Sequence, residues 1–369
     1  MKKVIYGTTA LLAAGMFAAA AEAATPLKLT VGGYLNAFMG YTNLSEKEMG
    51  DRVNKFAIGT DGEIVFTAET KLDNGIKVGA IAEVVIGSVD ATGNQRWLDD
   101  VYTYAETKYG KVELGATDNV AKKLHNGAPE VGPLDTIKIA NWLGVIPAVS
   151  LDSTTIKFGG NSKKISYFSP KFYGFQLGAS YIPGAARFGA FQITHNGAQP
   201  SGVLKANNAF SNAYAISGAY EGKFSGVTVG ADVAYGSVGF RNNLFKKNQE
   251  QYSFGADVSF SGFTVGAGYS FYDWNLNRKN NDQSFELGVG YENGPYAVSA
   301  NYFFSKIGKY MGTEMSKFQK YQVSGKYKLG AGVDAFATFA YLDLNDRAAT
   351  GYEDLNKVWT VVTGLALTF

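Results

Sequence analysis

Four carboxylates recur at alternate positions in two neighbouring stretches of the chain, and their spacing is the clearest starting point for chemistry. Asp61, Glu63 and Glu69 fall within one stretch, and Glu83 falls within the next. Both stretches alternate between apolar and polar residues, which predicts strands whose successive side chains point to opposite faces. The four acids then share one face, where they concentrate negative charge and favour nearby cations.

Residues suited to catalysis or to soft-metal binding are scarce. The chain has no cysteine, and its two histidines, His125 and His195, lie in predicted loops away from any nucleophile motif. We therefore predict that the protein is not an enzyme and that it needs no cofactor and no metal. Glu46, Glu48 and Asp51 gather in one predicted loop, but they lack the spacing of an EF-hand, so solvated acids are the expected interpretation.

The elements that position these residues are strands, and the clearest is the last one, residues 357–369. Its larger side chains share one face, and they are Trp359, Val361, Leu365, Leu367 and Phe369. The length suits a tilted strand that crosses a bilayer. A terminal phenylalanine on the larger apolar face fits the interfacial aromatic girdle of an outer-membrane barrel. Taken alone, the stretch also allows an edge strand of a soluble β-protein.

The start of the chain indicates export. A positively charged end and an apolar run precede the small residues of Ala21-Glu22-Ala23. This order predicts a secretory signal peptide over residues 1–23 and a mature domain over residues 24–369. Its removal takes away two lysines and one glutamate, so the formal net charge falls from +2 to +1. A nearly neutral domain gives no sign of a nucleic-acid partner.

Composition supports a barrel in a membrane. Aromatic residues reach 14%, yet the mean hydropathy is only -0.09. After the signal peptide, no stretch approaches the roughly 18 apolar residues of a transmembrane helix. Strands that alternate apolar and polar residues produce this near-neutral average, and a barrel that faces lipid requires that alternation.

The alternation continues along the chain and gives a strand count. The predicted early strands are 27–39, 56–71, 76–86, 97–108 and 111–117, and the most regular later ones are 252–260, 263–271, 285–291 and 296–304. Asp73-Asn74-Gly75 predicts a hairpin with a type I′ turn. Short and long connections alternate between the strands, as in bacterial barrels. We predict about sixteen strands, and a barrel of that size encloses an aqueous channel.

Several short motifs make the sequence similar to the trimeric general-diffusion porins of Gram-negative bacteria. Three of them are KLTVGGYLNAF at residues 28–38, Leu72-Asp73-Asn74-Gly75 and the closing Phe369. Asp61-Gly62-Glu63-Ile64-Val65-Phe66 is similar to the family's D-S-R-I-G-F motif, and Pro129-Glu130-Val131-Gly132 is similar to its P-E-F-G motif. The resemblance spans the mature chain. It implies an all-β, transmembrane antiparallel barrel with a long third extracellular loop, residues 118–161, that folds into the lumen. It also implies three copies in each assembly.

The resemblance and the strand phase together suggest where the channel is narrowest. We expect the constriction at Glu63, Glu130, Asp135 and Lys138, with Asp61 and Glu83 lining the pore. The family usually places an arginine at the position of Glu63, in a basic cluster on the wall. Here the arginines fall in or beside predicted outer loops, and they are Arg52, Arg96, Arg187, Arg241, Arg278 and Arg347. We therefore hypothesise a weak cation preference, while loop lysines that line the pore would favour anions.

These features predict a passive outer-membrane channel for ions and small hydrophilic solutes. A solute-specific channel is an alternative, and its inward aromatic candidates are Tyr34, Phe38, Tyr272 and Phe303. A structural or adhesive barrel is another. The first three strands carry small and aliphatic outward residues, among them Leu35, Ala37, Ala80, Ala82 and Val84. We expect these strands, with the closing strand, to form the homotrimer contact, and the remaining surface to face outer-membrane lipid.

Overall fold

The protein is described from a computed structural model. The structure describes residues 26–43, 54–86, 98–142, 153–156, 158, 160–184, 210–240, 247–273, 282–310, 313–346 and 357–369. The predicted signal peptide lies outside these ranges, as do all six arginines, His195 and the acids of the first predicted loop.

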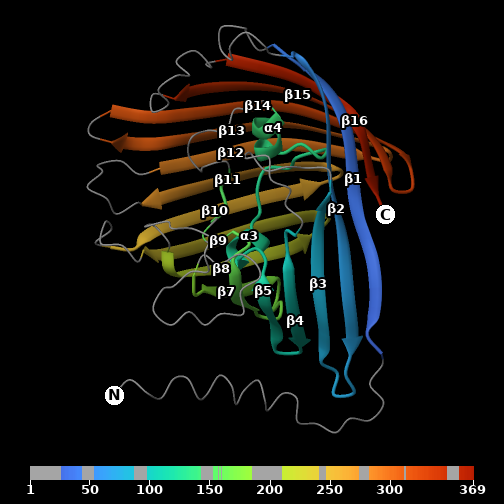
Figure 1. Cartoon of the computed structure of the whole chain (residues 1–369), viewed down its shortest axis with the longest axis vertical. Coiled ribbons are helices and arrows are strands. Elements are labelled where there is room, and N and C mark those ends of the chain that lie inside the picture. The colour runs from blue at the N-terminus through green and yellow to red at the C-terminus, as the bar shows by residue number, and fades with distance from the viewer. Residues whose placement is uncertain are drawn as a thin grey trace, which may run out of the picture.

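Sixteen antiparallel strands form a closed barrel in which each strand pairs with its neighbours in sequence and β16 pairs with β1. The strands are β1 (Lys28–Thr42), β2 (Phe56–Lys71), β3 (Lys77–Ile86), β4 (Val101–Thr107), β5 (Gly110–Ala116), β6 (Lys163–Phe168), β7 (Phe175–Ile182), β8 (Phe210–Phe224), β9 (Val227–Phe240), β10 (Gln249–Phe260), β11 (Phe263–Asp273), β12 (Asp282–Asn293), β13 (Tyr296–Tyr310), β14 (Thr313–Gly330), β15 (Val333–Asp346) and β16 (Lys357–Thr368). Figure 1 shows red β16 beside blue β1, where the barrel closes. The predicted fold class and strand number are confirmed.

The closing strand completes the ring with its last residue. The register of β1 against β16 runs from the pair Tyr34 and Thr368 to the pair Thr42 and Thr360. Beyond it, the Gly33 amide donates to the Phe369 carbonyl at 2.9 Å, and the Phe369 amide donates to the Gly33 carbonyl at 3.1 Å. The terminal phenylalanine ring is 62% exposed on the outer face. It therefore combines backbone closure with an aromatic side chain directed toward the surroundings of the barrel.

The two faces of the sheet differ as the sequence alternation predicts. On β10, Tyr252 and Phe254 are exposed, whereas Gln251 and Ser253 between them are buried. The same change from apolar to polar recurs on β14, where Tyr321 is exposed and its neighbours are buried. An apolar outer face and a polar inner face suit a barrel that separates lipid from a wet interior.

The hairpin turns correct one prediction. At Asp73-Asn74-Gly75 only Gly75 has a positive φ, of 82°, so the type I′ assignment is wrong. The Leu72 amide donates to the Ile76 carbonyl at 2.8 Å, which leaves a three-residue loop with glycine in the left-handed position. Type I′ geometry occurs instead where two successive residues have positive φ, at Tyr173-Gly174, Ser225-Gly226 and Ser261-Gly262. There glycine follows a residue for which the turn itself imposes the left-handed conformation.

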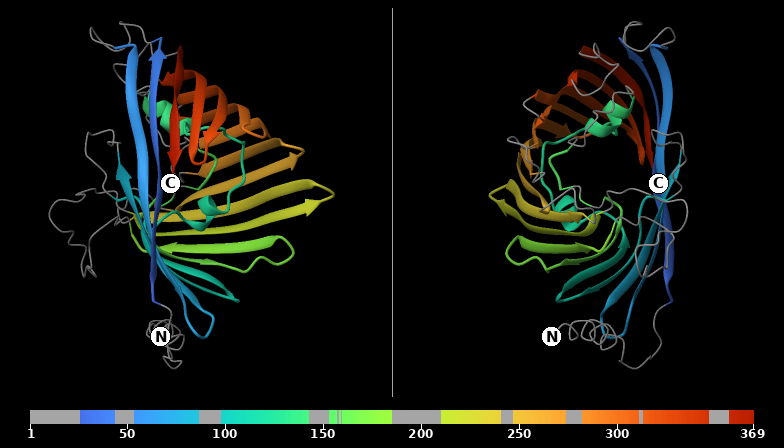
Figure 2. Two further views of the ribbon diagram at one scale, coloured as in Figure 1. Left: turned by 90° about the vertical axis from the view of Figure 1, so that its right-hand side faces the viewer. Right: turned by 60° about the vertical axis from the view of Figure 1, so that its left-hand side comes forward.

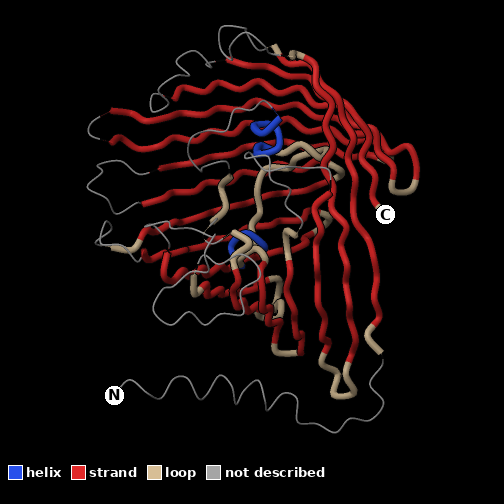
Figure 3. Tube along the Cα trace, in the orientation of Figure 1, coloured by secondary structure: helices blue, strands red, loops and turns tan. Residues whose placement is uncertain are grey.

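Two short helices lie in the connection between β5 and β6, residues 117–162, which is called the third-loop segment below. They are α3 (Val120–Lys123) and α4 (Thr136–Trp142). Figures 2 and 3 show both helices on the concave side of the sheet. Neither described helix has the length or the apolar character needed to span a membrane.

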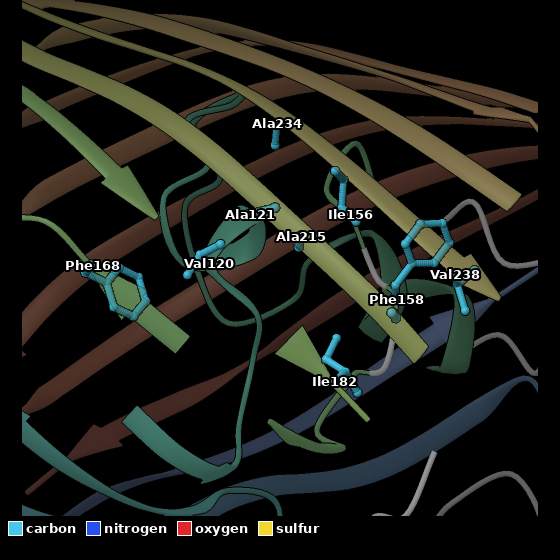
Figure 4. Close-up of a cluster of buried hydrophobic side chains, with 10 residues drawn as sticks. Val120, Ala121, Ile156, Phe158, Phe168, Ile182, Ala215, Ala234 and Val238 are labelled. Carbon is cyan, nitrogen blue, oxygen red and sulfur yellow. The ribbon is translucent and has the colours of Figure 1, made fainter. Parts of the chain in front are cut away.

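Each helix brings an apolar cluster against the inner face. Val120 and Ala121 of α3 pack in a buried cluster with Ala215 of β8 and Ala234 of β9 (Figure 4). Ile139 of α4 packs in a second cluster whose wall residues are Phe303, Phe318, Phe336, Ala340, Leu342, Val358 and Val362. The α3 cluster contains three alanines of β8 and β9, whereas the α4 cluster contains three phenylalanines of β13 to β15.

The predicted strands agree with the described ones to within three residues at most boundaries, but the predicted strand at 296–304 continues to Tyr310, and the fourth strand begins late. The predicted strand at 97–108 starts later, at Val101, because the preceding residues form a loop whose backbone is paired with β3. Asp99 donates its amide to the Glu83 carbonyl at 2.9 Å, and Glu83 donates its amide to the Asp100 carbonyl at 2.8 Å.

Replacing Phe369 tests the role of the closing strand. We expect Phe369→Asp to reduce the folded protein in outer membranes severalfold, because a carboxylate replaces the exposed ring at the point of closure. Heat-modifiable migration on gels measures the folded fraction. Tyr173→Asn is the matched control, since it also removes an exposed aromatic ring but keeps a residue that tolerates positive φ. Equal folded levels for both variants would contradict this role.

Candidate pore constriction

Lys164 holds the two ends of the third-loop segment together. Its side chain is buried, and its Nζ donates to the carbonyl oxygens of Gly160 and Ser162, both at 2.7 Å, and to that of Thr117. Thr117 opens the segment and Ser162 closes it. A buried ammonium that is surrounded by carbonyl oxygens from both ends therefore fixes where the segment leaves the wall and where it returns.

Asn119 ties the outgoing and returning parts of the segment to each other. Its side-chain oxygen caps α3 by accepting from the Lys122 amide at 3.1 Å, and its Nδ2 donates to the Ile156 carbonyl at 2.8 Å. The Val120 amide donates to Ser180 Oγ of β7 at 3.0 Å. The segment is thus folded back on itself beside β6 and β7 before it crosses the barrel.

The middle of the segment is held by two carboxylates of the wall. His125 Nδ1 lies 3.1 Å from Asp232 of β9, and the Asn126 amide donates to the same carboxylate at 2.6 Å. Glu286 of β12 accepts from the Ala128 amide at 3.3 Å and from Thr154 Oγ1 at 3.0 Å. His125 therefore lies between two acids, with its Nε2 2.9 Å from Thr154 Oγ1 and 3.8 Å from Glu286.

These acids set the protonation of His125. Burial lowers the pKa of the imidazole, but hydrogen bonds and charge from Asp232 and Glu286 outweigh it and raise the pKa to about 9. The ring is therefore protonated at neutral pH, with a donor on each nitrogen. The charged form is the one that anchors the segment between β9 and β12.

Farther along, the segment contacts β13 and β14. Lys320 of β14 is fully buried and donates to Glu130 at 2.8 Å and to Gln322 Oε1 at 2.9 Å. Gln322 also donates to the Leu134 carbonyl at 2.7 Å. Removing the Glu130 carboxylate would leave a buried ammonium without its counter-charge, at a cost of about 3–5 kcal/mol. Burial raises the pKa of Glu130 and Lys320 opposes that rise.

α4 carries the segment to the first strands. Asp135 precedes the helix, and its Oδ1 accepts from the Lys138 amide at 2.8 Å. The Lys138 ammonium forms an ion pair with Asp61 of β2 at 2.6 Å and lies 5.4 Å from the centre of the Tyr34 ring. Trp142 Nε1 donates to Thr360 Oγ1 of β16 at 3.1 Å. The segment therefore reaches from β7 to the seam where the barrel closes.

Beside α4 lies a group of five acids, called the acidic wall below, which consists of Asp61, Glu63, Glu83, Asp99 and Asp100. Carboxylate oxygens of the last three lie within 4.8 Å of one another. Burial, opposed by a hydrogen bond from Thr117 and reinforced by the nearby acids, raises the pKa of Asp100. Like charges this close disfavour one another.

The lysines of α3 form their ion pairs outside the acidic wall, although both lie close enough for their charge to act on Asp100. Lys122 pairs with Asp118 at 2.7 Å, and Lys123 pairs with Glu113 of β5 at 2.6 Å. Glu113 also accepts from Lys111 at 2.8 Å. Lys122 thus has an acid of its own, whereas Lys123 shares Glu113 with Lys111.

The structure unites only part of the predicted constriction. Asp61, Glu63 and Lys138 lie together, and Glu83 lies in the same acidic wall. Glu130 instead contacts β14, and Asp135 caps α4.

Sequence reasoning missed several anchoring residues, namely Asp232, Glu286, Lys320, Glu113 and Lys164. The sequence alternation places these charged residues on the inner face of the barrel. That placement could have indicated anchoring residues, because a charged residue there needs a partner or water. The sequence does not show which loop atom supplies that partner.

Comparison with known proteins identifies the family. A family model described as Gram-negative porin matches residues 7–347. The chain belongs to this family. An uncharacterized protein from Rickettsia bellii (strain RML369-C) is 22% identical to this porin. The match covers 89% of this porin and 88% of the Rickettsia protein.

Solved porins share the fold. An anion-selective porin from Comamonas acidovorans is 16% identical, with a TM-score of 0.61, and covers 93% of this porin and 100% of its own chain. The trimer form of OmpT from Vibrio cholerae is 10% identical, with the same TM-score and coverage. A further solved porin is 16% identical, with a TM-score of 0.59, and the match covers 93% of this porin and 100% of that chain. Porins of this family and fold are non-enzymatic channels of the outer membrane.

The His125 anchor predicts a response to alkaline pH. The imidazole pKa is higher in the anchored segment than in water, so the anchor is at full strength below about pH 6.5 and is lost as the pH rises through about 9. We expect closing events in single-channel recordings to become several times more frequent between pH 7 and pH 10. His125→Gln, which keeps a hydrogen-bonding side chain without this titration, should lack the step near pH 9. The same pH profile in both proteins would contradict the anchor.

Proposed function

We propose that this porin is a passive diffusion channel for ions and small hydrophilic solutes, in which the third-loop segment forms the narrowest section. The observation that carries the proposal is the chain of contacts from that segment to inner-face residues of β2, β9, β12 and β14. A barrel of sixteen strands is too wide to be filled by its own side chains. A segment anchored at opposite parts of the wall narrows it while leaving a polar passage.

We propose a weak cation preference for this channel. Only charges near the narrowest section act on a passing ion, because at physiological salt each charge reaches about 8 Å. Lys138 pairs with Asp61, whereas Glu63 and Glu83 form no ion pair with any described residue. Carboxylates in the acidic wall therefore outnumber the ammonium groups that pair with them, and this excess favours cations. Similarity of fold to an anion-selective porin does not argue against this, since selectivity depends on side chains rather than on the barrel.

The aromatic side chains do not favour a solute-specific track. Phe303 is 1% exposed in the cluster around Ile139 of α4, and Tyr272 packs against Phe158 with ring centroids 5.4 Å apart. Phe38 likewise contacts Trp142 at 5.4 Å. The third-loop segment therefore covers three of the four candidates and leaves Tyr34 beside Lys138. A sugar track needs several accessible rings in succession.

Conductance in planar bilayers tests the channel and its selectivity. The wild type should conduct ohmically, without block by added sugars, and its reversal potential in a KCl gradient should show cation preference. Glu63→Arg should shift that potential toward anion preference, since it changes the acidic wall by two charges. Glu250→Arg, on the outward side of β10, is the charge-matched control and should leave the potential unchanged. An anion-selective wild type, or no shift with Glu63→Arg, would remove Glu63 from the constriction.

We further propose that the protein is a homotrimer joined through its first strands and the closing strand. Aromatic pairs follow the outer face around most of the barrel, for example Tyr181 with Tyr214, Tyr302 with Tyr321, and Tyr296 with Tyr327. Among the described residues, β2 to β5 have no such pair on that face. A shallow apolar groove lies there instead, lined by Leu29, Phe66, Ala68, Ala80, Ala82, Val101, Thr103 and Leu114.

This difference fits a barrel whose aromatic belts contact lipid interfaces and whose small residues contact another subunit. We expect Ala80→Trp to lower the temperature at which trimers dissociate on semi-native gels by about 10 °C or more, because the ring fills the groove. Val265→Trp, on the outer face of β11, should have little effect. Subunit cross-links through residues 250–300, or a strictly monomeric conducting protein, would refute this interface.

A further inference from the structure

Six glycines on the inner face form a bare patch beneath the third-loop segment. They are Gly230 of β9, Gly255 of β10, Gly266 and Gly268 of β11, and Gly288 and Gly290 of β12, and they are called the glycine seat below. Strand pairing makes the patch continuous, because Gly255 lies opposite Gly268 and Gly266 lies opposite Gly288. Glycine weakens strands, so its repetition at neighbouring inward positions needs a structural reason.

The reason lies in what a side chain would meet at these positions. A Cβ at Gly255 would collide with the Asn126 carbonyl oxygen, and one at Gly266 would collide with the Gly127 carbonyl oxygen. A Cβ at Gly288 would lie 3.0 Å from the Cβ of Ala128. Residues 126–129 thus follow the strands one after another, with their backbone resting directly on the backbone of the wall.

The segment cannot move aside to admit such a side chain. Asp232 accepts from the Asn126 amide at 2.6 Å, and Glu286 accepts from the Ala128 amide at 3.3 Å. On the next strand, Asn301 Nδ2 donates to the Pro129 carbonyl. Contacts therefore pin the segment laterally at both edges of the glycine seat. An added methyl group could be accommodated only by lifting residues 126–129 away from the wall.

We propose that the glycine seat is the determinant of pore width in this porin. The glycines let the segment lie at backbone contact distance from β9 to β12, so the passage on its other side is as wide as the barrel allows. A side chain at the seat displaces the segment toward the acidic wall and narrows the passage. This inference rests on the proposed function, since it needs the segment to border the conducting path.

Two substitutions of graded severity test the effect on conductance. Gly255→Ala meets a backbone atom, whereas Gly290→Ala meets only the Pro129 side chain at 3.2 Å. We expect single-channel conductance to fall for both, and more for Gly255→Ala. Gly325→Ala is the matched control, because a Cβ there has no neighbour closer than 3.9 Å on the outer face of β14, and its conductance should equal that of the wild type.

A cysteine pair tests the seating directly, and the wild-type chain contributes no cysteine of its own. In Ala128→Cys with Gly288→Cys the two Cβ atoms lie 3.0 Å apart, so a small lift of the segment brings them to the roughly 3.5–4.5 Å separation of a disulfide. With an added oxidant, we expect this pair to form an internal disulfide that alters gel mobility until it is reduced. Ala128→Cys with Gly325→Cys should not.

The possible outcomes distinguish the role of the glycine seat from the proposed channel function. Disulfide formation together with a conductance loss confined to the seat variants supports the proposal. If the folded Ala128–Gly288 cysteine pair fails to oxidise, or if Gly255→Ala and Gly290→Ala conduct like the wild type, the glycine seat does not set the pore width. If Gly255→Ala does not assemble, Gly290→Ala alone decides. A wild type that does not conduct would refute the channel, while the disulfide result would still locate the segment.

Discussion

Every feature of this porin depends on closure of the hydrogen-bonded ring between β1 and β16. In hydrocarbon no water can pair with a free amide or carbonyl, so a spanning sheet must have no open edge. The register from Tyr34 to Thr42 meets this demand, and the pairing of Gly33 with Phe369 extends it to the last residue. Closure also fixes the faces, because a slip by one residue would turn every inward side chain toward lipid.

Closure on this scale creates a second requirement inside the ring. Sixteen strands surround more space than their side chains can fill, and inward polar groups need partners. The third-loop segment supplies many of them, since Asp232, Ser299 and Gln322 each form a hydrogen bond with its backbone. Most charges of the segment are used in this anchoring, and Glu130 with Lys320 is the clearest case. The charge left over is therefore that of the acidic wall, whose acids lie on β2, on β3 and in the loop before β4.

The sequence predicted the barrel because period-two alternation is a local property. It predicted the inward phase of Asp61 and Glu63 for the same reason, and it also allowed the number of strands to be counted. The pairing of Glu130 with Lys320 could not be predicted, because the two residues are 190 positions apart and the path of the loop decides it. The predicted type I′ turn at Asn74 was wrong because an Asn-Gly pair is compatible with more than one kind of hairpin loop. The length of the connection selects among them.

The glycine seat is a second feature that the sequence alone could not predict. Gly255, Gly266 and Gly288 fall on the polar face in the sequence pattern, where they look like ordinary small residues of a wet surface. Their meaning depends on what lies above them, and that is a segment more than a hundred residues earlier in the chain. Periodicity assigns a face to a residue, whereas only the fold identifies the neighbour across the interior.

The attachment of the third-loop segment at both sides of the barrel has a mechanical consequence. A single-layered cylinder is stiff along its strands but is easily flattened across them, because flattening only bends the sheet. The segment joins β2 and β16 to β9 and β12 through an ion pair and several hydrogen bonds. It acts as an internal brace, so pressure from the membrane or from osmotic swelling must stretch these contacts before the cross-section becomes oval.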